Sequence, residues 1–190
     1  MITLLAIASF AAVPGPSATW STLTTSPTLI ECTEAGGKPY CRSTGVIGVP
    51  VASAVGVFAH LDQHAAKMES ISLVERLEPD VLHVVMDYPF PFWDRDYVAK
   101  FTRRTDADGT EVFAWAPIQH AGAPPDPGLV RLPIDGEWRF KAEGANTRVT
   151  YIWMADPGGD IPDANQVRKK AGTLAIKDLA NAAGTTILSP

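Results

Sequence analysis

The sequence predicts an α+β fold in which a curved antiparallel sheet wraps around one long C-terminal helix. Short strand-like segments follow one another between hairpin turn signals, which is typical of an antiparallel sheet. A single long helical stretch comes last, with an N-cap at Asp163 and a stop at Gly184. Hydrophobic residues make up 46% of the 190 residues, so the chain is able to bury a sizeable core.

The N-terminal elements are expected to be a hairpin and a helix. Residues 28–32 and 40–48 are strand-like and flank a Gly-Gly turn signal. Pro50 then suits the first turn of a helix, where a missing N–H costs nothing. Apolar residues recur at helical spacing to about Met68, with a break expected near Asp62.

A run of strands separated by turn signals follows this helix. We expect strands at 71–77, 81–88, 97–104, 110–118, 129–132, 138–142 and 147–156. The apolar face of so long a sheet needs a cover, and one long helix remains to provide it. A sheet that curves around the helix satisfies this need.

The predicted inner face of the C-terminal helix is mostly small. Its members at helical spacing are Val167, Ala171, Leu174, Ala175, Leu179 and Ala183. Protein interiors are normally filled to crystal-like density. A helix that packs through alanines leaves room for an apolar ligand, unless it simply packs closely on the sheet.

The N-terminal segment is apolar, uncharged and broken by Pro14-Gly-Pro16. It is too short to span a bilayer, and it fits the hydrophobic region of a secretory signal peptide. We therefore expect residues 1–18 to be a signal peptide or a disordered N-terminus, residues 19–184 to be one ligand-binding domain, and residues 185–190 to be a tail.

The two cysteines, Cys32 and Cys41, flank the predicted hairpin turn. Folding the hairpin brings them together, and in an oxidising compartment they would form a disulfide. The alternative is two unrelated buried thiols. With the signal-like N-terminus, the cysteine pair favours an exported protein, periplasmic or secreted.

Charge and motifs exclude several function classes. A formal net charge of −5 without a Lys/Arg cluster argues against a nucleic-acid partner. His60 and His64 share a helix face, but the third ligand and the glutamate of a zinc hydrolase are missing. No nucleophile, phosphate-binding or dinucleotide motif occurs, so we expect no catalytic residue, no metal and no cofactor.

Three segments together resemble the signatures of START domains (steroidogenic acute regulatory protein-related lipid transfer). They are Pro89-Phe-Pro-Phe-Trp-Asp-Arg-Asp-Tyr-Val98, His120-Ala-Gly-Ala-Pro-Pro-Asp-Pro-Gly-Leu-Val-Arg131, and Thr147-Arg-Val-Thr-Tyr151 with Asp156-Pro-Gly-Gly-Asp-Ile-Pro162. They occur in the family's order and spacing, and the match covers roughly residues 20–183. The chain looks like a bacterial, single-domain member.

The resemblance implies a helix-grip fold with an apolar tunnel between sheet and helix. It implies non-enzymatic binding and transfer of a single lipid, such as a sterol, a phospholipid or a fatty acid, by a monomer in transient contact with a membrane surface. The alternative is a helix-grip enzyme of the polyketide cyclase or hydrolase type, which acts on an apolar aromatic substrate.

One position departs from the sterol-binding members of the family. Some of them place an Arg in the cavity six residues after the signature Arg, and here that residue is Phe101. The facing strand offers Leu82, Val84 and Met86 in place of an acid. A buried charge pair is therefore not expected, and the tunnel should be more apolar.

Strand alternation and the helix face nominate the residues that line the tunnel. The candidates are Leu82, Val84, Met86, Ala99, Phe101, Val149, Tyr151, Trp153, Ala171, Leu174 and Ala175. The alternative for each is ordinary core packing. The hydroxyl of Tyr151 is a candidate partner for a lipid headgroup, or else it bonds to the backbone.

The proline-rich corner carries two further expectations. Arg95 is expected to form a structural salt bridge with Asp94 or Asp96. Phe90, Phe92 and Trp93 are expected either to touch a bilayer or to pack the corner against the sheet.

Overall fold

A large sheet and one long helix dominate the structure, a computed structural model that describes residues 13–15, 17–88, 92–158, 161 and 163–190. The strands are β1 (Ser21–Thr24), β2 (Leu29–Ala35), β3 (Lys38–Ile47), β4 (Ile71–Glu78), β5 (Val81–Met86), β6 (Arg95–Thr105), β7 (Glu111–Pro117), β8 (Val130–Arg131), β9 (Gly136–Glu143), β10 (Asn146–Met154) and β11 (Ile187–Ser189). The helices are α1 (Val51–Ala59) and α2 (Ala164–Ala182), with two 3₁₀ turns, η1 (Leu61–Gln63) and η2 (Ala65–Lys67).

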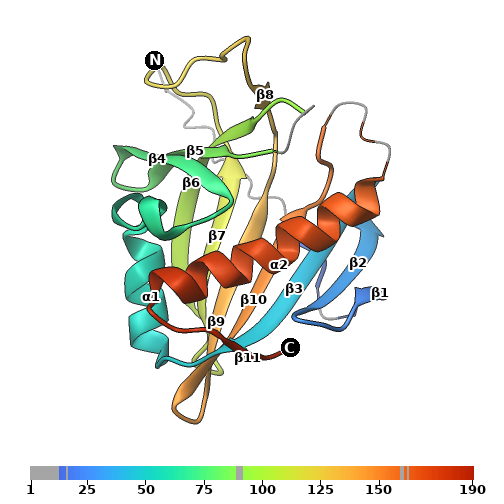
Figure 1. The fold of residues 1–190 in the computed structure, drawn as a ribbon, viewed down its shortest axis with the longest axis vertical. Coiled ribbons are helices and arrows are strands. Elements are labelled where there is room, and N and C mark those ends of the chain that lie inside the picture. The colour runs from blue at the N-terminus through green and yellow to red at the C-terminus, as the bar shows by residue number, and fades with distance from the viewer. Residues whose placement is uncertain (1–12, 16, 89–91, 159–160, 162) are drawn as a thin grey trace, which may run out of the picture.

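The strands form one sheet in the order β1-β2-β3-β10-β9-β7-β6-β5-β4. Neighbours along this path are antiparallel. At the sides of the path, β11 pairs with β3, and β8 pairs with β6 in parallel. Helix α2 crosses one face of the sheet, and α1 lies near its C-terminal end (Figure 1). The predicted α+β helix-grip architecture is confirmed.

The helical region after Pro50 breaks earlier than the sequence suggests. Helix α1 ends at Ala59, and η1 and η2 follow as separate 3₁₀ turns. The buried face of α1 includes Ala54, Val55 and Phe58. Phe58 packs between the sheet and α2, with its ring centroid 4.9 Å from that of Phe113. The apolar spacing therefore identifies the buried face but not the end of the helix.

Helix α2 begins and ends where its capping residues predict. The side chain of Asp163 accepts a hydrogen bond from the Gln166 backbone N–H at 3.1 Å, which satisfies one of the free donors of the first turn. Gly184 follows the helix with a φ of +71°, a conformation that glycine adopts without strain. At the N-terminal end, Arg168 Nε donates to the Ala155 carbonyl at 3.1 Å, and this bond ties α2 to the end of β10.

Helix α2 lies close against the sheet at Gly172. A Cβ at this position would lie 2.8 Å from Trp153 Cη2 and 3.0 Å from Ile30 Cδ1. One edge of the helix therefore rests directly on the side chains of the sheet. The neighbouring edge, which carries Ala171 and Ala175, faces open space instead.

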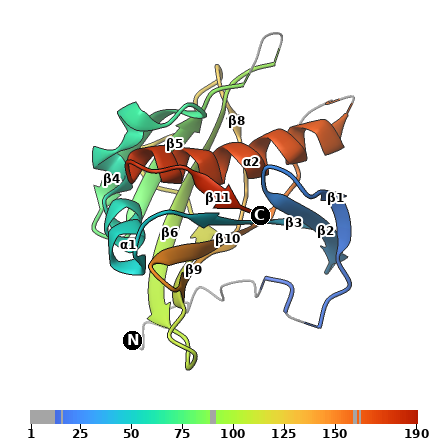
Figure 2. The same cartoon turned by 60° about the horizontal axis from the view of Figure 1, so that its bottom comes forward.

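Two short strands differ from the sequence expectation. Residues 21–24 lie in a Ser/Thr-rich stretch but form β1, which pairs with β2. Residues 187–189 were expected in a tail, but they form β11, which pairs with β3 beside α2 (Figure 2). Each is defined by its pairing with a longer strand, β2 or β3, which the local pattern does not reveal.

Some expectations fall on residues outside the described part. These are the signal-like segment 1–12, the corner residues 89–91, and residues 159, 160 and 162 of the third signature segment. In the described part of the chain, neither helix is long and apolar enough to cross a membrane.

Candidate functional site

A cavity of about 160 Å³ lies between α2 and the sheet. Helix α2 contributes Val167, Lys170, Ala171, Leu174, Ala175, Asp178 and Leu179 to its wall. The sheet contributes Ile71, Met86, Tyr97, Phe101, Trp115, Trp138 and Tyr151. Phe58, Leu61, Met68, Ser70, Asp87, Tyr88 and Phe92 complete the wall. The surface is therefore mostly apolar and aromatic.

The cavity exists because the helix stands off the sheet on one side. At Gly172 the helix lies directly on side chains of the sheet, and the alanines next to it are too short to fill the gap that opens beside them. Close packing occurs at Gly172, and the space lies under Ala171 and Ala175.

Stacked aromatic rings form the floor of the cavity on the sheet. The ring centroid of Tyr151 lies 4.4 Å from that of Trp138 and 5.7 Å from that of Trp115. Trp153, which belongs to the packed core beside the floor, stacks on Tyr151 at 4.7 Å. A Cβ at Gly136 would lie 2.4 Å from Trp115 Cζ2, so this glycine gives the indole ring its place over β9. Side chains held this closely make a rigid wall.

The tyrosine hydroxyls in the wall remain protonated at neutral pH. Burial raises the pKa of Tyr97 and of Tyr88 above the ordinary value. Burial also raises the pKa of Tyr151 well above that value, and the nearby Tyr97 and Tyr88 add to the effect. These side chains therefore present neutral O–H groups.

Asp178 on α2 is a charged residue in a mostly apolar wall, and its hydrogen bonds explain how its side chain is buried there. The residue is 2% exposed. Its carboxylate accepts bonds from the backbone N–H groups of Glu69 and Ser70 at 2.8 and 3.0 Å, and from Ser70 Oγ at 2.5 Å. Next to it, Lys177 Nζ pairs with Glu69 at 2.6 Å. Asp178 therefore joins α2 to the segment that leads into β4, at the edge of the cavity.

Six of the eleven nominated residues lie in the cavity wall. They are Met86, Phe101, Tyr151, Ala171, Leu174 and Ala175. The other five, Leu82, Val84, Ala99, Val149 and Trp153, belong to the packed core instead. Alternation correctly places them on the inner side of the sheet, but it does not tell how far along the strand the cavity extends.

Several wall residues escaped the sequence reasoning. Trp115 and Trp138 lie on strands whose parity was left unassigned, and Phe58 belongs to the helix before the long run of strands. Asp178 carried a usable signal, because it stands seven residues after Ala171 on a face that is otherwise apolar.

The structure contradicts the expected salt bridge of Arg95 with Asp94 or Asp96. The guanidinium of Arg95 donates instead to the carbonyls of Trp93, Pro157 and Gly158 and lies 4.2 Å from the ring centroid of Tyr88. Successive residues of a strand point to opposite faces, so Arg95 and Asp96 are directed apart. The structural role remains, through backbone carbonyls rather than a carboxylate.

Asp96 finds its partners on the outer face of the sheet. Its oxygens accept two bonds from Arg131, at 2.8 and 2.6 Å, and its Oδ2 lies 2.9 Å from His83 Nε2. Burial opposes ionisation of Asp96, but the bonds from Arg131 and His83 outweigh it and hold the pKa below its usual value. Two of the signature segments are thus joined by Asp96 and Arg131.

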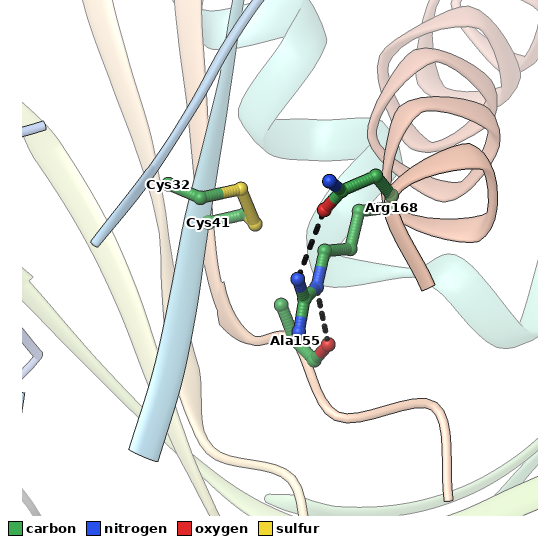
Figure 3. Close-up of a disulfide and its surroundings, with 5 residues drawn as sticks. Cys32, Cys41, Ala155 and Arg168 are labelled. Atoms are coloured by element: carbon green, nitrogen blue, oxygen red, sulfur yellow. Dashed lines mark hydrogen bonds between the residues drawn. A yellow bond between two sulfur atoms is a disulfide. The ribbon is translucent and has the colours of Figure 1, made fainter. Parts of the chain in front are cut away.

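The predicted disulfide between Cys32 and Cys41 is confirmed. The two residues face each other in the register of β2 and β3, with a Cα–Cα distance of 4.0 Å. Figure 3 shows the bridge and, nearby, the Arg168–Ala155 hydrogen bond at the start of α2. Cys41 is buried in the same cluster as Trp115 and Trp153, so the bridge fastens the sheet beside the aromatic floor.

Phe101 occupies the position at which the sequence indicated a missing arginine. It lies in the cavity wall, with its ring centroid 6.0 Å from that of Trp115 and 6.2 Å from that of Phe58. Leu82 and Val84 of the facing strand are buried hydrophobic residues. This part of the wall is therefore apolar.

Solved structures similar to this one are StAR-related lipid transfer domains. A STAR-related lipid transfer protein of Xanthomonas axonopodis matches at a TM-score of 0.73 and 21% identity over 87% of this chain and 98% of its own. Human StAR-related lipid transfer protein 5 matches at 0.71 and 15%, over 88% of each chain. Human STARD10 matches at 0.67 and 18%, over 93% of this chain and 82% of its own.

The likeness is one of structure. No family model matches the sequence, and no curated protein does. The resemblance of the three sequence segments and the similarity of the whole structure nevertheless agree. The chain has the helix-grip fold of StAR-related lipid transfer domains, with an aromatic cavity beneath its C-terminal helix.

Proposed function

We propose that residues 19–184 bind a single lipid in the cavity beneath α2 and carry it between membranes as a monomer, without catalysis. The observation that carries this proposal is the apolar wall between α2 and the stacked aromatic floor. Removal of lipid chain from water stabilises a complex by about 0.8 kcal/mol per CH₂. The lipid transfer proteins of similar structure support the same role.

The size of the cavity indicates that a lipid must enlarge it. At about 160 Å³, the cavity is close to the roughly 150 Å³ that holds benzene in an engineered protein core. Pockets for drug-sized ligands span about 300–1,000 Å³. We propose that the wall residues Asp87, Tyr88 and Phe92 move outward as the ligand enters.

Trp93 is the proposed point of contact with a bilayer. Its side chain is 65% exposed, whereas the adjacent Phe92 lies in the cavity wall. Tryptophan suits the membrane–water interface, where its ring is partly buried and its N–H stays hydrated. A tryptophan this close to the wall residues would bring the cavity to the lipid surface.

Export of the protein is the third part of the proposal. The Cys32–Cys41 disulfide is compatible with an oxidising compartment. The apolar N-terminal segment of the sequence supports the same location.

A vesicle-to-vesicle transfer assay tests the proposed activity. Donor vesicles carry a fluorescent sterol, phosphatidylcholine or fatty acid, and the appearance of the lipid in acceptor vesicles is followed with and without protein. Phe101→Arg should slow transfer strongly, because it places a charge in an apolar wall. Thr102→Arg is the matched control on the exposed side of the same strand and should transfer as wild type does.

Two results would contradict this proposal. The first is a wild-type protein that moves none of the three lipids. The second is conversion of an aromatic polyketide by the purified protein, which would favour the enzymatic alternative.

A further inference from the structure

Polar atoms without partners lie within the aromatic wall. Trp115 is 4% exposed, and its Nε1 has no hydrogen-bond partner among the described residues. Tyr97 and Tyr151 also line the wall and are partly buried, and neither hydroxyl has a hydrogen-bond partner among the described residues. Tyr40 shows the contrast, since its hydroxyl donates to Asp135 at 2.6 Å. Buried polar groups in proteins are normally paired, so the indole N–H of Trp115 calls for a partner, and the two hydroxyls are free to bind the same group.

The three side chains are neighbours, although they come from different strands. Tyr97 is on β6, Trp115 on β7 and Tyr151 on β10. The rings of Trp115 and Tyr151 are stacked at 5.7 Å, and Tyr97 packs against the same cluster. All three line the same cavity, so a ligand in it faces all three side chains.

The chemistry of the donors selects an acceptor. An indole N–H only donates, and a protonated tyrosine hydroxyl donates as well. An anion is disfavoured here, because burial in the wall opposes negative charge. The basic side chain in the described wall, Lys170, is exposed, and the buried Asp178 is already engaged with Glu69 and Ser70.

We propose that the cavity receives an uncharged carbonyl or hydroxyl oxygen of its lipid against Trp115 Nε1 and the hydroxyls of Tyr97 and Tyr151. The inference rests on the proposed lipid-binding function. The ligands are therefore neutral lipids whose oxygen enters the tunnel. In the complex this oxygen lies over the aromatic floor and not at the mouth of the cavity.

Binding of three probes of equal chain length tests the inference. Dodecan-2-one, dodecane and dodecanoate are titrated against the full chain, with tryptophan fluorescence as the readout. The double variant Tyr97→Phe/Tyr151→Phe removes two hydroxyls and keeps the rings. We expect this variant to bind dodecan-2-one about 5- to 50-fold more weakly, as the loss of two net hydrogen bonds implies. Its affinity for dodecane should be unchanged.

Tyr40→Phe is the matched control. It removes a hydroxyl from the same sheet, outside the cavity wall, and should lower stability while leaving the affinity for dodecan-2-one as in wild type. Thermal unfolding of each variant establishes that it is folded. If the double variant does not fold, the comparison of ketone with carboxylate in the wild type still decides, since we expect the ketone to bind more tightly.

The outcomes separate this inference from the proposed function. Equal weakening of ketone and hydrocarbon by the double variant, or tighter binding of dodecanoate than of dodecan-2-one by the wild type, would overturn the inference and leave lipid binding intact. Absence of binding for all three probes would overturn the proposed function itself.

Discussion

Filling the cavity from the helix side should abolish lipid binding and stabilise the empty protein. Ala171 lies in the wall on α2, and Ala171→Phe adds a ring of about the size of benzene. The cavity, at about 160 Å³, is close to one that benzene fills. The single substitution is therefore expected to occupy most of the space that a lipid chain would enter.

The magnitudes follow from the cavity volume. A cavity costs about 24 cal/mol per Å³, so complete filling of this one would recover at most about 4 kcal/mol. Overpacking strain of about 1–3 kcal/mol opposes this gain. We expect a net gain of about 1–3 kcal/mol, which raises the melting temperature by roughly 2–4 °C per kcal/mol for a chain of this length.

The loss of ligand affinity should be larger than the gain in stability. The inserted ring excludes at least about four CH₂ groups of a lipid chain, and each is worth about 0.8 kcal/mol. Binding should therefore weaken by about 3 kcal/mol, which is more than 100-fold. The assays are lipid titration by tryptophan fluorescence and thermal unfolding monitored by circular dichroism.

The matched control is Ala164→Phe, at the first residue of the same helix and outside the cavity wall. It should alter neither lipid affinity nor the ligand-induced rise in melting temperature. The reasoning would be refuted if folded Ala171→Phe bound lipid as tightly as wild type, because the ligand would then lie elsewhere.

Three further predictions concern the contacts that hold the cavity together. Cys32→Ser/Cys41→Ser should lower stability by about 2–3 kcal/mol through the loss of a short closed loop, measured by urea unfolding; two titratable thiols in denatured protein from its native compartment would argue against the bridge. Asp178→Ala should lower the free energy of unfolding by about 3 kcal/mol or more, because it leaves buried donors unpaired. Lys177→Ala removes an exposed ion pair and should change the midpoint of urea unfolding little. Equal effects of the two variants would contradict the role of the buried carboxylate. The folded-state pKa of Asp96 lies below its usual value. Its ionised form therefore stabilises the fold above about pH 4, and this stabilisation is lost as the pH falls through the folded-state pKa. Asp96→Asn should lower the free energy of unfolding at pH 7 and much less at pH 2.5, and an equal loss of stability at both pH values would contradict this.

The fold was predictable from the sequence because local and global signals agree. Hairpin turns, strand alternation and the Asp163 cap each specify a local structure, and together they leave one helix to cover one sheet face. The short strand 187–189 was not predictable in this way. It owes its place to the edge of β3, which the chain reaches only after α2 has crossed the sheet.

The sequence predicted an apolar cavity beneath α2, but it did not predict which residues line that cavity. The small residues of α2 correctly indicated an unfilled space, and Phe101 indicated an apolar wall. Leu82 and Trp153 share the inner face of the sheet with true wall residues, yet they lie in packed core. Trp153 lies where Gly172 brings the helix onto the sheet, a three-dimensional fact that no strand pattern contains.

The unpaired donors of the aromatic floor lay beyond the reach of sequence reasoning for a related reason. A tyrosine or tryptophan in a strand is ordinary, and only the structure shows that Trp115 Nε1 lacks a partner among the described residues. Tyr151 was singled out as a hydroxyl for a headgroup. Its neighbours Tyr97 and Trp115 come from strands distant in sequence, and their meeting depends on the strand order.

Native mass spectrometry of the purified protein, before and after incubation with mixed lipid vesicles, reports directly whether the cavity takes up a lipid. We expect a complex with one lipid per chain, and we expect no such complex for Ala171→Phe under the same conditions. Lipid binding beneath α2 would be ruled out by a wild-type protein that remains entirely free of lipid, or by a lipid complex that forms equally well with the cavity filled.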